Sequence, residues 1–168
     1  MIVAQLKPHE ILAVAIESEV DAAAFYTRLE ERVANEILLQ KLKFLAFEEV
    51  KHRQVLEKLF GQRFPGQPAA APAGVRLPRL SGLLAGEPTV FSLFEAALKA
   101  EEASEAFYND AAKVIMDEAG QRILAYLARV ERSHQAIIRS EVDLLRRFPD
   151  SYKVSDFHLG QEMFNIGP

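Results

Sequence analysis

Residues 45–52 of the chain read Leu-Ala-Phe-Glu-Glu-Val-Lys-His, and residues 127–134, at an offset of 82 positions, read Leu-Ala-Arg-Val-Glu-Arg-Ser-His. The same offset relates Glu19 to Glu101 and Tyr26 to Tyr108, so each half reads Glu, six residues, Tyr, 22 residues, Glu, two residues, His. Self-similarity of this kind predicts an internal duplication of one supersecondary unit. We therefore expect two copies of a helical hairpin, related by approximate two-fold symmetry.

The helices are predicted from the distribution of helix-breaking residues. Residues 9–60 contain no proline or glycine, and residues 89–148 contain only Gly120. Each stretch is too long for one globular helix, so each is predicted to form a pair of helices. The prediction is an all-α, antiparallel four-helix bundle over residues 1–148, with helices at about 8–34, 36–60, 89–117 and 119–148.

Residues 61–88 separate the two hairpins and hold most of the prolines and glycines, which is typical of an irregular connection. A short link would suffice if the hairpins met at the same end of the bundle. The 28-residue link instead predicts a long crossover to the opposite end. Residues 149–168 are expected to form a C-terminal tail that packs on or beside the bundle.

Charged residues on the inward helix faces are the main functional signal. Apolar residues at alternating spacings of three and four define these faces, and each face carries a glutamate near its middle. An ionised carboxylate inside a bundle is costly unless it is paired, and no lysine or arginine lies on these faces. The pattern predicts a site for two divalent cations, with the ligands Glu19, Glu49, His52, Glu101, Glu131 and His134.

Hairpin geometry places these residues at one level of the bundle. Glu19 and Glu49 are equidistant from residue 34, and Glu101 and Glu131 are equidistant from residue 116, where the two turns are expected. Four carboxylates carry a charge of −4, which two divalent cations neutralise. Mixed carboxylate and imidazole ligands suit iron or manganese, so diiron, Fe/Mn and dimanganese occupancy all stay open.

These motifs resemble the ferritin-like superfamily of diiron-carboxylate proteins, and in particular the rubrerythrin-like branch without a rubredoxin domain. The resemblance covers roughly residues 8–148. It implies a ferritin-like bundle and a cofactor of two non-haem iron ions. By this analogy Glu49 and Glu131 bridge the metals, while Glu19 with His52, and Glu101 with His134, are terminal ligands.

Three departures from the family pattern bear on the reaction. Typical rubrerythrins carry a further carboxylate three residues after the third-helix ligand, where this chain has Ser104. The chain has no cysteine and hence no rubredoxin-type iron site, so a separate electron donor, such as a rubredoxin or another reductase, is expected. Val50 follows Glu49 where haem-binding bacterioferritins have methionine, so no haem is expected.

The resemblance implies a non-haem diiron oxidoreductase that reacts an Fe(II) pair with peroxide or O2. The alternatives are an iron-handling or storage ferroxidase and an O2-dependent diiron oxygenase. Tyr26 and Tyr108, two turns from Glu19 and Glu101 on the same faces, are candidate catalytic residues that support the ligands or carry radicals, or else ordinary core tyrosines. Glu48, like Glu17 and Glu102, lies beside a ligand in sequence and is expected to face solvent.

Composition limits the remaining classes of function. A length of 168 residues favours one domain. The net charge of −4, without a basic stripe, argues against a nucleic-acid partner. No apolar run approaches the ~18 residues of a membrane span, and no secretory signal is recognisable, so the expected location is the cytoplasm. A homodimer is expected because long bundles of this family often pair.

Overall fold

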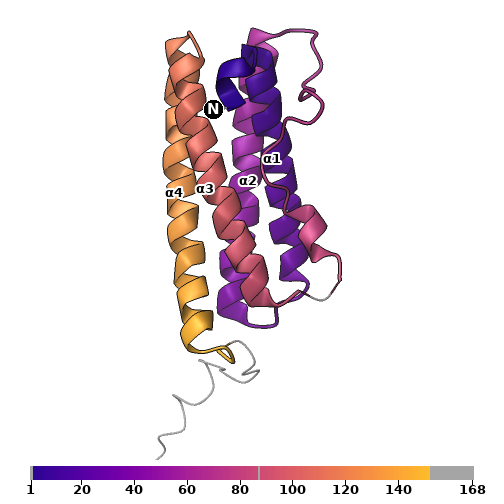
Figure 1. Cartoon of the computed structure of the whole chain (residues 1–168), viewed down its shortest axis with the longest axis vertical. Coiled ribbons are helices and arrows are strands. Elements are labelled where there is room, and N and C mark those ends of the chain that lie inside the picture. The colour runs from indigo at the N-terminus through magenta and orange to yellow at the C-terminus, as the bar shows by residue number, and fades with distance from the viewer. Residues whose placement is uncertain (1, 87, 152–168) are drawn as a thin grey trace, which may run out of the picture.

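The computed structural model describes residues 2–86 and 88–151. Four long helices run side by side as one bundle (Figure 1): α1 (Pro8–Glu30), α2 (Glu36–Arg63), α3 (Val90–Val114) and α4 (Glu118–Arg147). Two short 3-10 helices, η1 (Ile2–Gln5) and η2 (Ser81–Leu84), lie outside it, and the described ranges contain no strand. The predicted all-α four-helix bundle is therefore confirmed.

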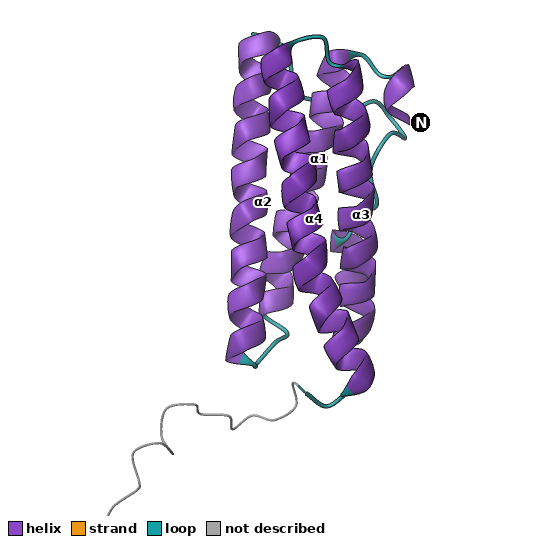
Figure 2. Cartoon of the chain, turned by 90° about the vertical axis from the view of Figure 1, so that its left-hand side faces the viewer, coloured by secondary structure: helices purple, strands orange, loops and turns teal. Residues whose placement is uncertain are grey.

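The bundle consists of two hairpins, since α1 packs most closely on α2 and α3 on α4 (Figure 2). Capping residues begin the second helix of each hairpin. The Asn35 side chain accepts a hydrogen bond from the Leu38 backbone N–H at 3.0 Å, and Asp117 accepts one from the Gly120 N–H at 2.6 Å. Such caps satisfy N–H groups that have no partner within the helix.

Three helix ends differ from the predicted bounds. α1 ends at Glu30 and α3 at Val114, several residues before 34 and 117, because the chain needs those residues to reverse direction before the extended caps. α2 continues to Arg63, past residue 60, because Gly61 weakens a helix without ending it and the next proline along the chain is Pro65.

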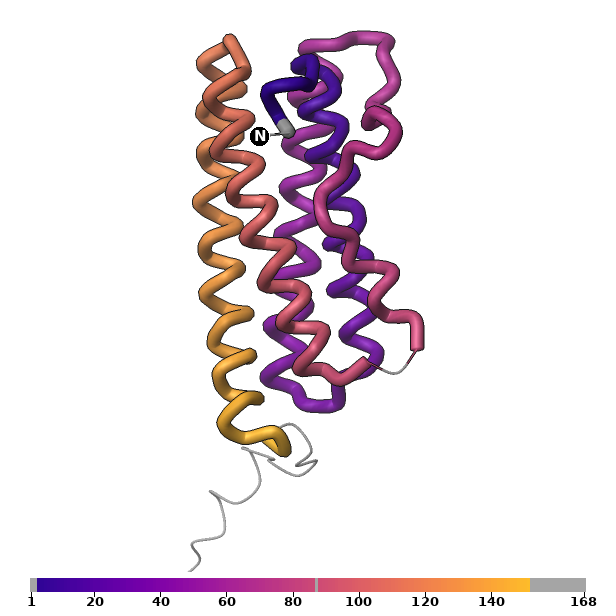
Figure 3. The backbone as a smooth tube through the Cα atoms, in the orientation of Figure 1, coloured from indigo at the N-terminus to yellow at the C-terminus, as the bar shows by residue number. Residues whose placement is uncertain are grey.

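The connection between the hairpins runs the length of the bundle along α1, as the tube in Figure 3 shows, so the predicted crossover is confirmed. We refer to residues 64–89 as the strap. Two carboxylates of α1 hold it: Glu17 accepts from the Ala71 N–H at 3.2 Å, and Asp21 accepts from the Leu80 N–H at 2.5 Å. Residues 152–168 lie outside the described residues, so the packing of the tail stays a prediction.

Apolar side chains form two clusters, one toward each end of the bundle. One includes Leu12, Leu56 and Leu124, and the other includes Leu42, Phe94 and Ile138. Both clusters exclude water and fix the register of the helices around the layer between them. No described helix combines the length with the low charge content that crossing a bilayer requires.

Candidate metal centre

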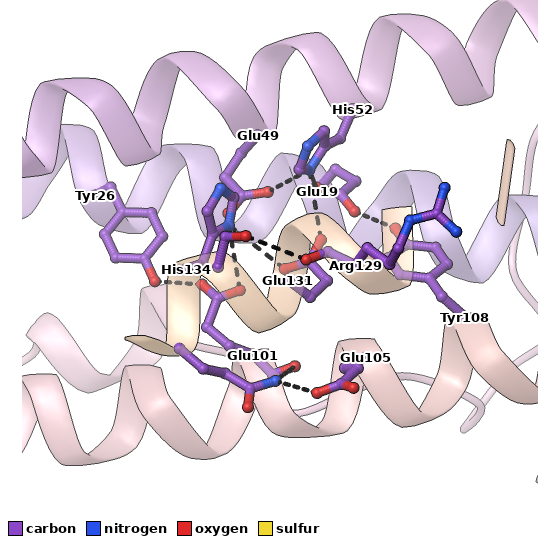
Figure 4. Close-up of polar contacts among 12 residues, drawn as sticks. Glu19, Tyr26, Glu49, His52, Glu101, Glu105, Tyr108, Arg129, Glu131 and His134 are labelled. Atoms are coloured by element: carbon purple, nitrogen blue, oxygen red, sulfur yellow. Dashed lines mark hydrogen bonds and ion pairs between the residues drawn. The ribbon is translucent and has the colours of Figure 1, made fainter. Parts of the chain in front are cut away.

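The layer between the two apolar clusters contains the six predicted ligands, and the structure brings all six together (Figure 4). α1 and α3 contribute one glutamate each, and α2 and α4 contribute a glutamate and a histidine each. Every one of these side chains is buried, with exposed fractions of 1–3%. The set consists of Glu19, Glu49, His52, Glu101, Glu131 and His134.

Glu49 and Glu131 occupy the centre of this cluster, because each touches both imidazoles. Glu49 Oε2 lies 3.2 Å from His52 Nδ1, and Glu49 Oε1 lies 3.1 Å from His134 Nδ1. Glu131 Oε1 lies 3.4 Å from His52 Nδ1, and Glu131 Oε2 lies 3.5 Å from His134 Nδ1. Each of these carboxylates therefore spans the two halves of the repeat.

Glu19 and Glu101 are peripheral, because each touches one imidazole only. Glu19 Oε2 lies 3.4 Å from His52 Nδ1, and Glu101 Oε2 lies 3.6 Å from His134 Nδ1. The two rings stack with their centroids 5.4 Å apart. The contacts thus repeat across an approximate two-fold axis, as the duplicated sequence predicts.

Tyr26 and Tyr108 are tied to the peripheral carboxylates, and each reaches the opposite half of the molecule. Tyr26 donates its hydroxyl hydrogen bond to Glu101, and Tyr108 donates to Glu19. The sequence spacing related each tyrosine to the glutamate on its own helix. Each tyrosine instead contacts the glutamate of the other helix, because α1 and α3 lie antiparallel. The two turns that separate Glu19 from Tyr26 along α1 therefore bring Tyr26 level with Glu101 on α3.

Burial, followed by the neighbouring carboxylate charges, raises the pKa of both tyrosines well above its ordinary value. For Tyr26 the largest charge effect comes from Glu101, and for Tyr108 it comes from Glu19. Both phenols therefore stay protonated and act as donors throughout the accessible pH range.

The pKa shifts of the ligands divide them into three groups. Burial, then the charge of Glu49, raises the pKa of Glu19 and of Glu101. Burial also disfavours ionisation of Glu49, but hydrogen bonds with Glu19 and the two histidines outweigh it and lower the Glu49 pKa. The pKa of Glu131 is lowered as well, since hydrogen bonds, first that of Glu101, outweigh burial and the Glu49 charge.

The two imidazoles carry positive charge that balances the negative charge of the central carboxylates. Burial opposes protonation of His52, but hydrogen bonds with Glu131, Glu19 and Glu49 raise its pKa to about 12. The pKa of His134 is raised for the same reason, with Glu101 the largest favourable partner. Without metal, two imidazolium ions balance two central carboxylates, while Glu19 and Glu101 favour the protonated form. The buried cluster is then electrically neutral.

Metal loading is therefore expected to release between two and four protons per chain at pH 7. Both histidines must lose a proton to bind a cation, and Glu19 and Glu101 lose theirs as they ionise. Because protons compete with the metal, affinity falls as pH falls. Zinc titration of the metal-free protein in weak buffer, with a pH indicator, measures this release. Release of fewer than two protons would contradict the assigned charge state.

The donor set of the cluster fits a pair of metal ions. Several cluster atoms are buried and, although most lie near another ligand, have no partner in good hydrogen-bond geometry: Glu19 Oε2, Glu49 Oε1, Glu131 Oε1, His52 Nε2, and both ring nitrogens of His134. Buried polar atoms without partners are rare in folded proteins and call for an explanation, such as a bound ion. Oxygen and imidazole donors in this number fit two cations of the iron or manganese type.

A single small cavity of about 10 Å³ touches all four carboxylates of the cluster. This volume holds about one water-sized molecule. Ser104 lines it, so the position at which typical rubrerythrins carry a further carboxylate does face the cluster. Pro78 and Leu80 of the strap also border the cavity, and Asp21, which binds the strap, lies beside them.

Three further acidic residues of the bundle have defined neighbours, and those of Glu48 differ from what the sequence indicated. Glu105 accepts hydrogen bonds from Gln135, at 2.7 Å, and from Arg132, and the latter lowers the Glu105 pKa. Glu141 is buried and pairs with Lys41. Glu48 was expected to face solvent, but it is half-buried and lies close to both imidazoles. Its i, i+4 spacing to His52 was the available signal.

Comparison with known proteins relates the chain to a protein family and to a solved structure. The family model described as Rubrerythrin matches residues 10–142. A solved structure from Pyrococcus furiosus, the hypothetical protein Pfu-1136390-001, is similar to this chain with 34% sequence identity and a TM-score of 0.80. The similarity covers 86% of this chain and 93% of that one. No curated protein matches the chain.

Proposed function

Because the chain belongs to the rubrerythrin family, we propose that it is an oxidoreductase and that its glutamate and histidine cluster is a non-haem diiron centre. The observation that carries the proposal is the buried set of six donor residues with unsatisfied atoms. The proposed substrate is hydrogen peroxide or O2. Two Fe(II) ions held by the cluster would supply the electrons that reduce either oxidant. A separate electron donor, such as a rubredoxin, would then reduce the iron again.

The contacts support distinct roles for the carboxylates. Glu49 and Glu131 each span both imidazoles, which is the arrangement that a bridging ligand requires. Glu19 is adjacent to His52 alone, and Glu101 to His134 alone, which fits terminal ligands. Tyr26 and Tyr108 hold one oxygen of each terminal carboxylate, which leaves the other oxygen of each beside an imidazole.

The size of the cavity beside the carboxylates favours a small oxidant. Room for about one water-sized molecule admits peroxide or O2 after slight side-chain motion and does not admit an organic substrate. This argues for peroxide reduction or iron oxidation over an oxygenase. Iron oxidation followed by storage is the second candidate, and it is favoured by Ser104, which removes the extra carboxylate of typical rubrerythrins.

The test is an anaerobic Fe(II) titration of the metal-free protein, followed by stopped-flow mixing with H2O2 or O2. We expect two irons per chain and near-ultraviolet absorption of the oxidised centre that develops faster with H2O2. Equal or faster oxidation by O2 would favour the iron-oxidation candidate. Loading of fewer than two irons would exclude a diiron centre. The native mass separates the proposed homodimer from a storage shell.

Asp21→Ala is expected to open the strap beside the cavity. Asp21 accepts from the backbone N–H groups of Leu80 and Ser81 and from the Ser81 hydroxyl. Hydrogen bonds to a charged group contribute about 1.5–3 kcal/mol each, so loss of this set should expose the metal at least about tenfold more often. The measurement is the rate at which a chelator removes iron. Asp110→Asn, on the surface of α3, is the control.

A further inference from the structure

His52 and His134 each turn the same ring nitrogen toward the carboxylates. In both residues Nδ1 makes the contacts of 3.1–3.6 Å with the glutamates. The other nitrogen, Nε2, is buried and has no hydrogen-bond partner in either ring. An imidazole that is protonated or metal-bound at Nδ1 carries a proton on Nε2, and a buried N–H requires an acceptor.

Glu48 is placed to be that acceptor. One of its carboxylate oxygens and one ring nitrogen from each histidine lie within 4.8 Å of one another. Glu48 precedes His52 by one helical turn, so both residues share a face of α2. Because the Nδ1 atoms are already beside other glutamates, the Nε2 atoms are left for Glu48. A change of the Glu48 side-chain rotamer would close the remaining distance.

The repeat supplies only one such carboxylate for two imidazoles. The residue that corresponds to Glu48 in the second half, at the offset of 82, is Val130. Phe44, which precedes Glu48 by one turn on α2, meets the His134 imidazole edge-on with ring centroids 6.5 Å apart. Neither residue accepts a conventional hydrogen bond through its side chain. Glu48, with two oxygens, has one for each ring.

We propose that Glu48 is a positioning residue that accepts hydrogen bonds from the Nε2–H groups of both His52 and His134. It thereby fixes the orientation of both rings, with Nδ1 toward the carboxylates. Partners of this kind hold metal-binding histidines in one tautomer, and their loss typically weakens metal binding about 10–100-fold. The effect on metal binding rests on the proposed diiron centre, whereas the hydrogen bonds themselves also form in the metal-free protein.

The experiment compares the full chain with Glu48→Ala, Glu48→Gln and the control Glu102→Gln. Glu102 also adjoins a predicted ligand but is exposed and pairs with Arg139 at 3.0 Å. Exchange of the histidine Nε2–H protons with water is measured by NMR in metal-free, 15N-labelled protein. The affinity for Co(II) is measured by titration. Denaturant midpoints verify that each variant folds.

In Glu48→Ala we expect Nε2–H exchange at least about tenfold faster and Co(II) affinity about 10–100-fold weaker. Glu48→Gln keeps an acceptor oxygen and should retain slow exchange, and Glu102→Gln should match the parent protein. Exchange that is unchanged in Glu48→Ala overturns the proposal, even where the lost charge weakens Co(II) binding. If the parent chain binds no Co(II) pair while Glu48→Ala still loses slow exchange, the proposed function fails and the role of Glu48 stands.

Discussion

Glu49→Ala is expected to lower the metal content of the protein from two divalent ions per chain to one at most. The Glu49 carboxylate lies 3.2 Å from His52 Nδ1 and 3.1 Å from His134 Nδ1, so it faces both positions that a cation would occupy. Its removal takes a ligand from both cations, whereas removal of a peripheral carboxylate takes one from a single cation. Anaerobic Co(II) titration with elemental analysis measures the stoichiometry.

The repeat provides matched comparisons for this prediction. Glu131→Ala should behave like Glu49→Ala, because Glu131 also spans both imidazoles. Glu19→Ala should retain one tightly bound ion, since Glu19 touches His52 alone. Glu57→Ala, an exposed position on the same helix as Glu49, should retain both. Two ions bound by Glu49→Ala with unaltered affinity would show that the cluster is not the metal site.

Metal removal is expected to lower the melting temperature by at least about 15 °C without unfolding the protein at room temperature. At a free ion concentration of 1,000 times Kd, each ion stabilises the fold by about 4 kcal/mol. For a chain of this size, 1 kcal/mol shifts Tm by about 2–4 °C. Calorimetry of the loaded protein, before and after addition of excess chelator, measures the change.

The metal-free protein should nevertheless stay folded, because its cluster is neutral without a cation. The raised histidine pKa values favour two imidazolium ions beside the ionised carboxylates of Glu49 and Glu131, and the raised pKa values of the peripheral pair favour their protonated form. A chelated protein without a cooperative melting transition would contradict this charge state. A melting temperature that does not respond to metal would instead contradict the metal centre, and Glu49→Ala should reduce the response.

Local spacing in the sequence was sufficient to predict the fold and to gather the six candidate residues. The helical period places Glu49 and His52 on one face of a helix, and the caps at Asn35 and Asp117 fix where each hairpin turns. Once the position of a turn is known, the number of residues from the turn to Glu19 and to Glu49 shows that both lie at the same height in the bundle. Whether these residues bind metal stays a prediction, which the stoichiometry experiments address.

Packing between the two hairpins decides which side chains of one hairpin contact those of the other, and the residue spacing within one hairpin does not contain this information. Because α1 lies antiparallel to α3, Tyr26 donates its hydrogen bond to Glu101 rather than to Glu19. The strap lies beside the carboxylates because Asp21 accepts a hydrogen bond from its backbone. The ring nitrogen that each histidine presents, and the approach of Glu48 to both rings, likewise depend on α2 meeting α4. Sequence periodicity determines which face of a helix a residue occupies, but only tertiary packing determines what that face meets.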